Sequence, residues 1–588
     1  MILQKRYVIL AAVLAVAPFV LPAFHITLLN YIGLYSIVAL GIVLLTGVAG
    51  QVSFGQAAFV GLAAYASGLL TTQYAQSPWM GLIAGVLITL AVAYVLGFIT
   101  LRMSGHYLPV ATIAWGMSLY YLFGNSEALG LFTGFGNIPA LKIFGMEIKS
   151  ERSFYWLIWL AVMASVWISL NLLDSRSGRA IRALKGRGMM AESFGVDTAR
   201  MKISVFLFAA FLAAISGWLY AHFQRYVNPT SFSLNWGVEF LFMAVVGGAG
   251  YVWGAVLGAA LITLLKHSLQ SVLPKLLGQE GNFELVVFGV LIVLLLQNAR
   301  EGLWPYLVKL TAKYFPAAPL QIKPAAELPR RAKPTGSDVL LQVNTVEKRF
   351  GGLIAVNKIG FDLGAGELIG LIGPNGAGKS TMFNLITGVA PVTSGEIRFC
   401  GQRIDTLSSR RIAGLGIART FQHVKLLPQM TTLENTAIGA YQRGSCGFLK
   451  SCFRLDRAEE AALLQNAARQ LERVGLGADV HELAGNLPLG KQRILEIARA
   501  LAADPILLLL DEPAAGLRYR EKVALAKLLS KLRAEGMSIL MVEHDMEFVM
   551  SLADRLVVMS FGAKLAEGRP HEVQQNPAVQ EAYLGGVA

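Results

Sequence analysis

The sequence predicts an all-α polytopic membrane domain followed by an α/β domain, and three observations support this fold class. No Asp, Glu, Lys or Arg occurs between Tyr7 and Leu101, an uncharged stretch far too long for a soluble domain. Hydrophobic residues make up 55% of the 588-residue chain and charged residues 15%, but the sequence after about Arg330 has ordinary globular composition. A short apolar run at 368–372 precedes a glycine-rich turn and a helical pattern, which is typical of a buried strand leading into a helix.

The first half contains enough apolar segments for a polytopic bundle. A helix needs about 20 apolar residues to cross roughly 30 Å of hydrocarbon. Candidate spans lie at residues 7–23, 28–46, 54–70, 80–101, 108–123, 154–172, 203–222 and 285–296. A further apolar stretch at 238–265 is interrupted by Gly247-Gly248-Ala249-Gly250, and we expect it to form two short helices hinged at the glycines.

The basic residues orient these spans. The formal net charge is +14, and many Lys and Arg flank the candidate spans, which is the positive-inside pattern and not a nucleic-acid patch. With Lys5 and Arg6 inside and an uncleaved first span, six spans return the 174–202 loop to the cytoplasm, and its seven Lys and Arg agree with that. The seventh span leaves 225–236 outside. The broken stretch must therefore return to the outside before the last span brings the soluble half into the cytosol.

Two polar features of the membrane half allow more than one interpretation. Gln51, Ser53 and Gln56 lie in a glycine-rich segment, 47–68, which could pack closely against other helices or form an unwound stretch that lines a substrate path. We favour packing, because small residues in membrane helices usually serve it. Glu239 is interpreted as an interfacial helix end and not as a substrate ligand, because a functional role is the default only deep in the bilayer.

The cytoplasmic loop at 176–202 contains a short amphipathic segment. Residues 177–185 can form a helix with Ile181 and Leu184 on one side, and Gly195 is a candidate helix stop. A basic helix of this kind could lie on anionic lipid or dock into a groove on the soluble half. The residues alone leave both alternatives open.

A proline-rich segment separates the two halves. The prolines between residues 311 and 337 are Pro316, Pro319, Pro324, Pro329 and Pro334. Proline at this density gives an extended, semi-rigid tether of roughly 3.1 Å per residue. Such a tether lets the soluble half dock on the membrane half without fixing the angle between them. The predicted limits are 1–310 for the transmembrane domain, 311–337 for the linker and 338–588 for the soluble domain.

The glycine-rich turn at 373–381 satisfies the pattern G-x-x-x-x-G-K-[ST] of a phosphate-binding loop. Its glycines let successive backbone N–H groups point at an anion, and the following helix N-terminus adds a positive dipole. Lys379 is expected to reach the β- and γ-phosphates, and Ser380 to offer its hydroxyl to Mg²⁺. The sequence thus predicts binding of a nucleoside triphosphate with Mg²⁺. The expected nucleotide-binding residues are Phe350, Asn375, Gly376, Gly378, Lys379, Ser380 and Thr381.

Polar side chains at the ends of two apolar runs complete the predicted chemistry. The run 506–510 ends in Asp511, placed to hold Mg²⁺ through water, and Glu512, placed to polarise the attacking water. His544 follows a second such run and could reach the γ-phosphate, and Gln422 can touch both Mg²⁺ and the lytic water. About twenty residues before the loop, the Phe350 ring can stack on adenine.

The soluble half from about Leu340 resembles an ATP-binding cassette (ABC) ATPase. The resemblance lies in the phosphate loop, Gln422, the Asp511-Glu512-Pro513 box, His544 and a signature-like segment, Leu487-Pro488-Leu489-Gly490-Lys491-Gln492. More narrowly, the segments 349–352, 419–423, 511–517 and 576–585 resemble ATPase subunits of branched-chain amino-acid importers. The membrane half is similar to a permease subunit of the same systems at 46–59, 177–195 and 246–254.

This resemblance implies ATP-driven import of branched-chain or related amino acids at a bacterial cytoplasmic (inner) membrane, with the ATPase domain in the cytosol. It favours docking of the 176–202 loop on the ATPase, with Ile181, Leu184, Glu192 and Gly195 as coupling residues. The implied partners are a second permease subunit, a second ABC ATPase subunit, an external substrate-binding protein and membrane lipid. Three alternatives are kept: an ABC exporter half-transporter, an importer of another small amino acid or an amide such as urea, and a membrane-tethered ATPase with a regulatory role.

The signature-like segment departs from the family pattern. Pro488 and Leu489 stand where a Ser and the first Gly are usual, and Arg518 stands where an Asp or Asn is usual. Proline is acceptable at a helix start, but the hydroxyl donor is lost and Leu489 crowds the approach to the backbone. We therefore expect this cassette to pair with a different cassette that has an intact signature, and a heterodimer is favoured over a homodimer.

Overall fold

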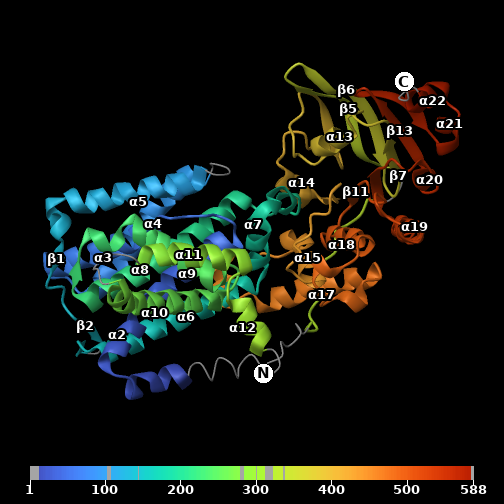
Figure 1. Ribbon diagram of the computed structural model, residues 1–588. Helices are drawn as coiled ribbons and strands as arrows, with labels where there is room; N and C mark the ends of the chain where they lie inside the picture. Colours follow the sequence, from blue (N-terminus) through green and yellow to red (C-terminus); the bar gives the residue numbers. More distant parts are fainter. Residues whose placement is uncertain are drawn as a thin grey trace.

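The computed structural model describes residues 12–101, 107–143, 145–277, 284–299, 301–311, 322–334 and 338–584. Figure 1 shows a helical bundle formed by the first half of the chain and an α/β domain formed by the second half, with the helix α7 between them. The predicted fold class, an all-α membrane domain followed by an α/β domain, is confirmed by this architecture.

The bundle is built from long apolar helices. Its helices are α2 (Ala23–Ile42), α3 (Gln56–Thr72), α4 (Pro78–Thr100), α5 (Tyr107–Asn125), α6 (Glu151–Leu173), α8 (Thr198–Gln224), α9 (Leu234–Gly248), α10 (Val252–Leu277) and α11 (Glu284–Asn298). Within the described residues, five helices are long and apolar enough to cross a membrane: Ala23–Val48, Pro78–Thr100, Glu151–Leu173, Thr198–Gln224 and Val252–Val272. The first of these includes a π-helix, η1 (Val43–Val48), which continues α2.

Several expected spans differ from the structure in detail. The expected spans at 54–70 and 108–123 are the helices α3 and α5, which lie outside that set of five. Of the expected span at 7–23, residues 12–20 are helical, and residues 7–11 lie outside the described part. The helix α7 (Arg176–Ser193) follows α6, and α12 (Trp304–Thr311) follows α11.

The broken apolar stretch is a helix pair, but the expectation of two short helices is wrong. The chain breaks after α9, which has 15 residues, whereas α10 runs unbroken for 26 residues. Close backbone contact holds the pair together, because a Cβ at Gly258 would lie 1.8 Å from the carbonyl oxygen of Met243. Since the break comes at the end of α9, the second helix keeps the length needed to cross a membrane. Glu239 of α9 pairs with Lys266 of α10 at 2.7 Å.

The end of the bundle far from the α/β domain carries short strands (Figure 1). The strand β1 (Phe135–Gly136) pairs with β4 (Tyr226–Val227), and β2 (Leu141–Ile143) pairs with β3 (Met146–Ile148). Three 3₁₀ turns complete this end in the described residues: η2 (Glu127–Leu129), η3 (Leu131–Thr133) and η4 (Pro229–Phe232).

Within residues 338–584, two sheets form the core of the α/β domain. The six-stranded sheet has the order β10-β11-β12-β7-β13-β14, with β14 antiparallel and the other neighbours parallel. Its strands are β7 (Leu368–Ile372), β10 (Ile417–Arg419), β11 (Leu507–Asp511), β12 (Ser538–Val542), β13 (Arg555–Ser560) and β14 (Ala563–Gly568). Every residue of β7, β11 and β12 is buried, as their uninterrupted apolar sequences predict for a parallel sheet.

The second sheet is antiparallel, and a helical part faces the bundle. The antiparallel sheet has the order β6-β5-β8-β9, formed by β5 (Val339–Phe350), β6 (Leu353–Gly364), β8 (Ser394–Phe399) and β9 (Gln402–Arg403). The helices are α13 (Lys379–Ile386), α14 (Ser409–Leu415), α15 (Thr432–Gly439), α16 (Phe448–Cys452), α17 (Arg457–Arg473), α18 (Leu489–Ala502), α19 (Tyr519–Ala534), α20 (Met546–Met550), α21 (Pro570–Gln574) and α22 (Pro577–Leu584). Of these, α16 contacts α6 of the bundle, and α14, α15 and α16 contact α7.

The described half of the proline-rich linker, residues 322–334, is bound to the cassette and is not a free tether. The Ala325 N–H donates to Gln465 at 2.9 Å, and the Arg331 N–H donates to Asp504 at 2.7 Å. Leu328 packs against Ala440, Leu463 and Ala502. The length of chain that can act as a tether is therefore shorter than the sequence predicts, because the extended backbone finds hydrogen-bond partners on the cassette.

Candidate functional site

The phosphate loop leads from the central strand β7 into α13. Gly373, Gly376 and Gly378 have φ angles of 149°, 79° and 96°, a region that favours glycine. A Cβ at Gly373 would lie 2.0 Å from the carbonyl oxygen of Met559, and one at Gly378 would lie 2.3 Å from that of Ala355. Gly373 and Gly378 are thus required by both the backbone conformation and the close neighbours, and Gly376 is favoured by its backbone conformation alone.

Lys379 lies at the start of α13 with its ammonium group against the loop. Its Nζ donates to the carbonyl oxygens of Gly373 at 2.7 Å and Pro374 at 2.9 Å. Burial lowers the pKa of the Lys379 ammonium, while Glu512 and Asp511 act in the opposite direction. Asn375, Gly376 and Ser380 are exposed on the loop, and Thr381 is half-buried. The loop therefore presents its polar groups outward, where a phosphate chain can approach them.

Three of the predicted catalytic side chains meet at one edge of the sheet. Glu512 Oε1 accepts a hydrogen bond from Gln422 Nε2 at 3.1 Å and lies 2.7 Å from His544 Nε2. They follow β11, β10 and β12, which are parallel neighbours, so their carboxyl ends share one edge. Glu512 has a φ of 49°, an unusual conformation for a residue with a side chain, which aims the carboxylate into this group.

Asp511 is buried at the same edge and pairs with a residue that the sequence reasoning gave no role. Its Oδ2 accepts from Arg419 Nη2 at 2.9 Å, and Arg419 Nη1 also donates to Asn384 at 2.7 Å. Burial raises the pKa of the Asp511 carboxyl, and Arg419 opposes that shift. The arginine was visible in the motif at 419–423, but only the fold shows that it faces the acid.

The donor set at this edge fits a magnesium ion. Asp511 Oδ1 is buried and has no hydrogen-bond partner within the described residues. The Ser380 hydroxyl is exposed at the start of α13, below the phosphate loop. Magnesium prefers such oxygen ligands and usually keeps several waters, so a carboxylate and a hydroxyl suit it.

Phe350 stays outside this hydrogen-bonded group. It ends β5, its side chain is 53% exposed, and Lys348 Nζ lies 4.9 Å from its ring centroid. An exposed ring is available for stacking on a flat ligand.

The signature-like segment forms the start of α18. Pro488 caps the helix, and Leu489 at its first position is 47% exposed. The Lys491 ammonium pairs with Asp479 at 2.8 Å, and Gln492 Nε2 donates to the carbonyl oxygen of Leu487 at 2.8 Å. Gly490 is covered by Glu521, since a Cβ there would lie 2.2 Å from Glu521 Oε1. A carboxylate and an isobutyl group thus occupy the surface that the motif would present to a phosphate.

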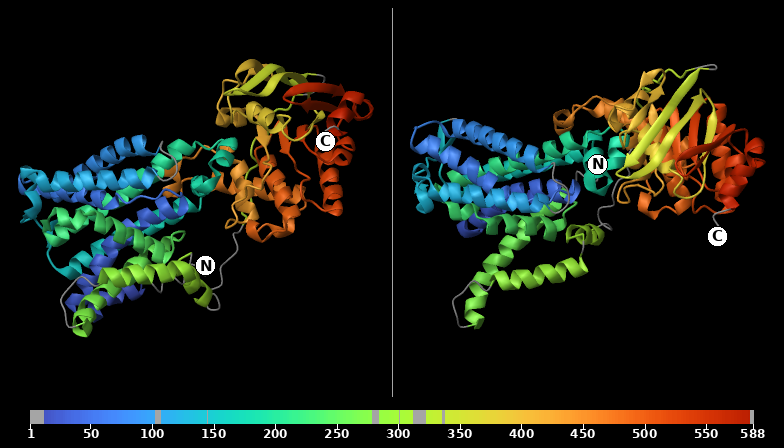
Figure 2. Two further views of the ribbon diagram at one scale, coloured as in Figure 1. Left: turned by 45° about the horizontal axis from the view of Figure 1, so that its top comes forward. Right: turned by 90° about the horizontal axis from the view of Figure 1, so that it is seen from above.

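The helix α7 connects the bundle with the cassette (Figure 2). It contacts α14, α15 and α16, and its backbone is non-helical at residues 185–187. Ile181 and Leu184 are buried, 1% and 7% exposed, in a hydrophobic cluster that includes cassette side chains. The amphipathic face predicted for residues 177–185 therefore packs against protein and not against lipid.

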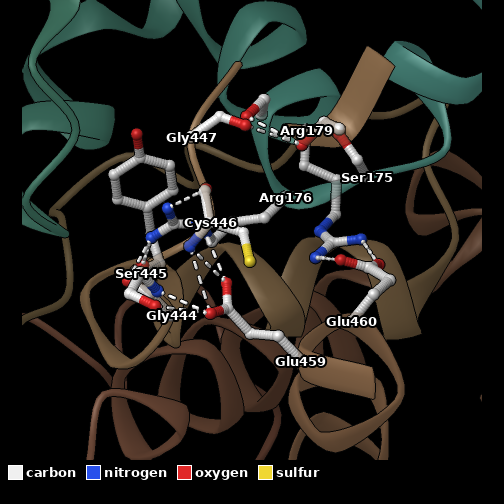
Figure 3. A network of polar contacts seen from close by, with 12 residues as sticks. Ser175, Arg176, Arg179, Gly444, Ser445, Cys446, Gly447, Glu459 and Glu460 are labelled. Atoms are coloured by element: carbon white, nitrogen blue, oxygen red, sulfur yellow. Dashed lines mark hydrogen bonds and ion pairs between the residues drawn. The ribbon is translucent and has the colours of Figure 1, made fainter. Parts of the chain in front are cut away.

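Arg176 and Arg179 of α7 make buried polar contacts across this junction (Figure 3), and α6 adds further contacts through Asn171. The Arg176 guanidinium donates to the carbonyl oxygens of Tyr441 and Gly444, both at 2.5 Å, and to that of Cys446. Arg179 forms a bidentate, buried ion pair with Glu460, in which Nη2 and Oε2 are 3.0 Å apart. Neither arginine belonged to the predicted coupling set, although both are in the segment that the sequence singled out.

The other predicted coupling residues have different surroundings. Gly195 has a φ of 86° and contacts the cassette directly, because a Cβ there would lie 1.8 Å from Gln442 Nε2. Glu192 instead accepts from the Thr198 hydroxyl at 2.5 Å, within the membrane half. The ion pair between Asp197 and Arg410 adds a contact that the sequence did not indicate.

The cassette carries a nucleotide-binding loop and an acidic cluster at the edge of a parallel sheet, and a helix of the membrane domain packs against it. Fold and site together therefore define an ABC ATPase joined to a polytopic membrane permease. Three family matches agree with this class. Residues 24–296 match the family described as "Branched-chain amino acid transport system / permease component", and 356–515 match "ABC transporter". Residues 563–588 match "Branched-chain amino acid ATP-binding cassette transporter".

Curated relatives of the cassette lead to the same family. The high-affinity branched-chain amino acid transport ATP-binding protein LivG of Escherichia coli K12 is 43% identical over 252 residues, 42% of this chain and 99% of LivG. BraF of Pseudomonas aeruginosa is 43% identical over 249 residues, 42% of this chain and 98% of BraF. A crystal structure of a nucleotide-free ATP-binding cassette from an ABC transporter is 31% identical, with a TM-score of 0.38, and covers 42% of this chain and 99% of that one. The chain belongs to the branched-chain amino acid ABC transporter family, with the permease and ATP-binding components in one polypeptide.

Proposed function

We propose that this protein imports branched-chain or related amino acids across a bacterial cytoplasmic membrane and drives that import by ATP hydrolysis. The proposal is supported by the family of both halves and by one structural observation, the seating of α7 on the cassette of the same chain. The proposed domain limits are 1–310, 311–337 and 338–588. The cassette lies in the cytosol in this proposal, so nucleotide-driven movement of α15 and α16 reaches the bundle through α7.

The side chains have the following proposed roles. Lys379 and the loop amides bind the phosphates, and Asn375, Gly376, Gly378 and Thr381 shape the cradle. Ser380, Gln422 and Asp511 hold Mg²⁺, which when bound neutralises charge on the β- and γ-phosphate oxygens. Glu512 accepts the proton of the attacking water, and His544, 2.7 Å from its carboxylate, holds Glu512 in place and faces the γ-phosphate. Phe350 stacks on adenine.

The proposed assembly is heteromeric. Leu489 and the Glu521 carboxylate at Gly490 leave this signature segment poorly suited to contact a phosphate bound by a partner. A second cassette with an intact signature then completes the site on this chain, and a second permease subunit completes the path. An external substrate-binding protein delivers the amino acid in this scheme.

Transport in intact cells tests the proposal. Cells that lack this chain are complemented with it or with its Glu512→Gln variant, and uptake of radiolabelled leucine is measured. We expect saturable uptake with the unmodified chain only, inhibited by excess isoleucine and valine but not by excess urea. Net efflux of leucine would favour the exporter alternative, and inhibition by urea alone would favour an amide importer.

A further inference from the structure

The connection between α2 and α3 is an interrupted helix with buried polar side chains. The π-helix η1 ends at Val48, residues 49–55 have no helical structure, and α3 begins at Gln56. Gln51 and Gln56 are nevertheless only 4% and 1% exposed, and Ser53 is 1% exposed. Both interpretations of the glycine-rich region hold in part. Gly47, Gly61 and Gly68 pack closely against other elements, as the sequence favoured, and residues 49–55 form an unwound segment enclosed by the bundle.

The backbone of the unwound segment is partly satisfied by protein, but the glutamine side chains are not. The Thr46 hydroxyl donates to the carbonyl oxygen of Gln51 at 3.1 Å, and the Phe54 N–H donates to the Thr112 hydroxyl at 3.2 Å. In contrast, Oε1 and Nε2 of both Gln51 and Gln56 are buried without a hydrogen-bond partner within the described part of the chain. Four unpaired amide atoms are unfavourable in a membrane domain, so their partners must come from bound water or from a ligand.

Two other helix interruptions touch this segment. A Cβ at Gly47 would lie 1.3 Å from the carbonyl oxygen of Ala249, so η1 is in backbone contact with the break between α9 and α10. Lys185 Nζ donates to the carbonyl oxygen of Gly47 at 3.1 Å, and Lys185 is the first non-helical residue of α7. A shift of α7 driven by the cassette therefore acts directly on the start of the unwound segment.

A small apolar space, with room for about one water molecule, adjoins the other end of the segment. Ser53 and Gly55 line it together with Thr112, Phe59, Leu96 and Phe206. Polar amides and hydroxyls thus lie on one short stretch of chain that ends beside aliphatic and aromatic side chains. This pairing of surfaces suits a small molecule with a charged end and an apolar end.

We propose that the segment 49–56 is a transient binding site for the transported α-amino acid, and this inference rests on the proposed function. The amide oxygens of Gln51 and Gln56 accept from the substrate ammonium group, and their amide nitrogens donate to its carboxylate. The space beside Ser53 holds only about one water molecule, so the bundle must open there before the aliphatic side chain of the substrate can enter. Lys185 connects this site with the cassette, so release of the amino acid follows movement of α7.

Separate replacement of Gln51 and Gln56 by leucine tests this site. Each variant is measured in the assembled importer, in cells, for uptake of radiolabelled leucine, and as purified full-length chain for thermal unfolding. We expect at least a tenfold loss of uptake with an unchanged or higher unfolding temperature, because an unpaired buried amide is replaced by an apolar group of similar size. The matched control is Thr89→Val, since Thr89 is fully buried in α4 and its hydroxyl also has no partner in the described residues.

Each outcome of this experiment has one meaning. Leucine uptake by the unmodified importer with equal uptake by both glutamine variants would overturn the inference and leave the proposed function standing. Loss of uptake together with a lower unfolding temperature would also overturn it, because the amides would then be structural. Equal losses in the Thr89→Val control would assign the effect to general packing and overturn the site. No uptake of leucine, isoleucine or valine by the unmodified importer would overturn the proposed function and the inference with it.

Discussion

Glu512 shows how much of the chemistry depends on the conformation of one residue. Its left-handed backbone follows a fully buried strand, and its carboxylate contacts Gln422 and His544. Their order and spacing around the phosphate loop predicted that these residues act together. Arg419 had no predicted role, since an arginine beside a motif gives no sign of which acid it faces. Its pairing with Asp511 appears only when β10 and β11 lie side by side.

We expect Glu512→Gln to bind ATP normally and to lose ATP hydrolysis by roughly 10²-fold or more, because an amide cannot accept the proton of the attacking water. ATP affinity and turnover are measured on the same purified chain assembled with its partners. Glu535→Gln is the control, since Glu535 is an exposed residue that pairs with Arg473 and has no predicted role at the nucleotide site. Normal turnover in Glu512→Gln would contradict the proposed role.

Lys379→Ala is expected to weaken ATP binding first, by roughly 10- to 100-fold, because a charge-assisted hydrogen bond to phosphate contributes about 1.5–3 kcal/mol. Equilibrium binding of a fluorescent ATP analogue measures the change. Replacement of the exposed Lys527 of α19 by alanine controls for the loss of one positive charge. Unchanged affinity in Lys379→Ala would show that the lysine does not contact the phosphates.

The helix α7 is in contact with both halves of the chain, and α6 adds contacts with α16. Its apolar face, Ile181 and Leu184, was readable from spacing alone. Its polar contacts were not, because Arg176 and Arg179 resemble any basic residues of a cytoplasmic loop. Their partners on the cassette distinguish them from other basic residues. Arg176 donates to three backbone carbonyl groups, and Arg179 pairs with the buried Glu460. A buried pair of this kind fixes position more than it adds stability.

Replacing both Ile181 and Leu184 by aspartate is expected to preserve basal ATP hydrolysis and to abolish its stimulation by a substrate-loaded binding protein. Two carboxylates cannot enter the buried seat without a large desolvation cost, so α7 leaves the cassette while the nucleotide site stays intact. ATPase rates with and without the loaded binding protein measure this in proteoliposomes. Met189→Asp on the same helix is the control, since Met189 is 48% exposed and its sulfur lies 3.9 Å from Lys425 Nζ of the cassette, a group that an aspartate can pair with. Full stimulation in the double variant would exclude α7 as the coupling element.

At the scale of the whole molecule, the linker residues 322–334 and the helix α7 hold the same small turn of the cassette. In the turn η5 (Tyr441–Arg443), Arg443 Nη2 donates a hydrogen bond to the carbonyl oxygen of Pro329 at 2.9 Å. On its other side, the carbonyl oxygen of Tyr441 accepts from Arg176. Composition predicted an extended linker, and residues 322–334 have no helix or strand. It gave no sign that the backbone there would pair with α17 and the residues after α18.

Leu328→Asp is expected to detach this segment from the cassette and to speed its proteolytic cleavage roughly tenfold. Burial of a half-buried leucine stabilises the bound segment by about 1–1.5 kcal/mol. The cleavage rate is proportional to the population of the opened segment, so loss of this free energy raises the rate roughly tenfold. Limited proteolysis of the full-length chain, with the cleavage site read by mass spectrometry, measures it. Ala326→Asp is the control because Ala326 is exposed in the same segment. Equal cleavage rates in the two variants would show that the segment is not held by Leu328.

The sequence by itself determined the order of the two domains, the position of the phosphate loop and the family, because these depend on apolar length and on short motifs whose spacing is local. Only the tertiary structure decided which partners the buried charges take, how long α10 is, where the chain between α2 and α3 unwinds and how the linker is bound. Those features depend on contacts between residues far apart in the chain. The local sequence around a glutamine, an arginine or a proline is the same whether or not a distant residue packs beside it. In this protein, the packing of the bundle and of the cassette decides which of these residues have a partner.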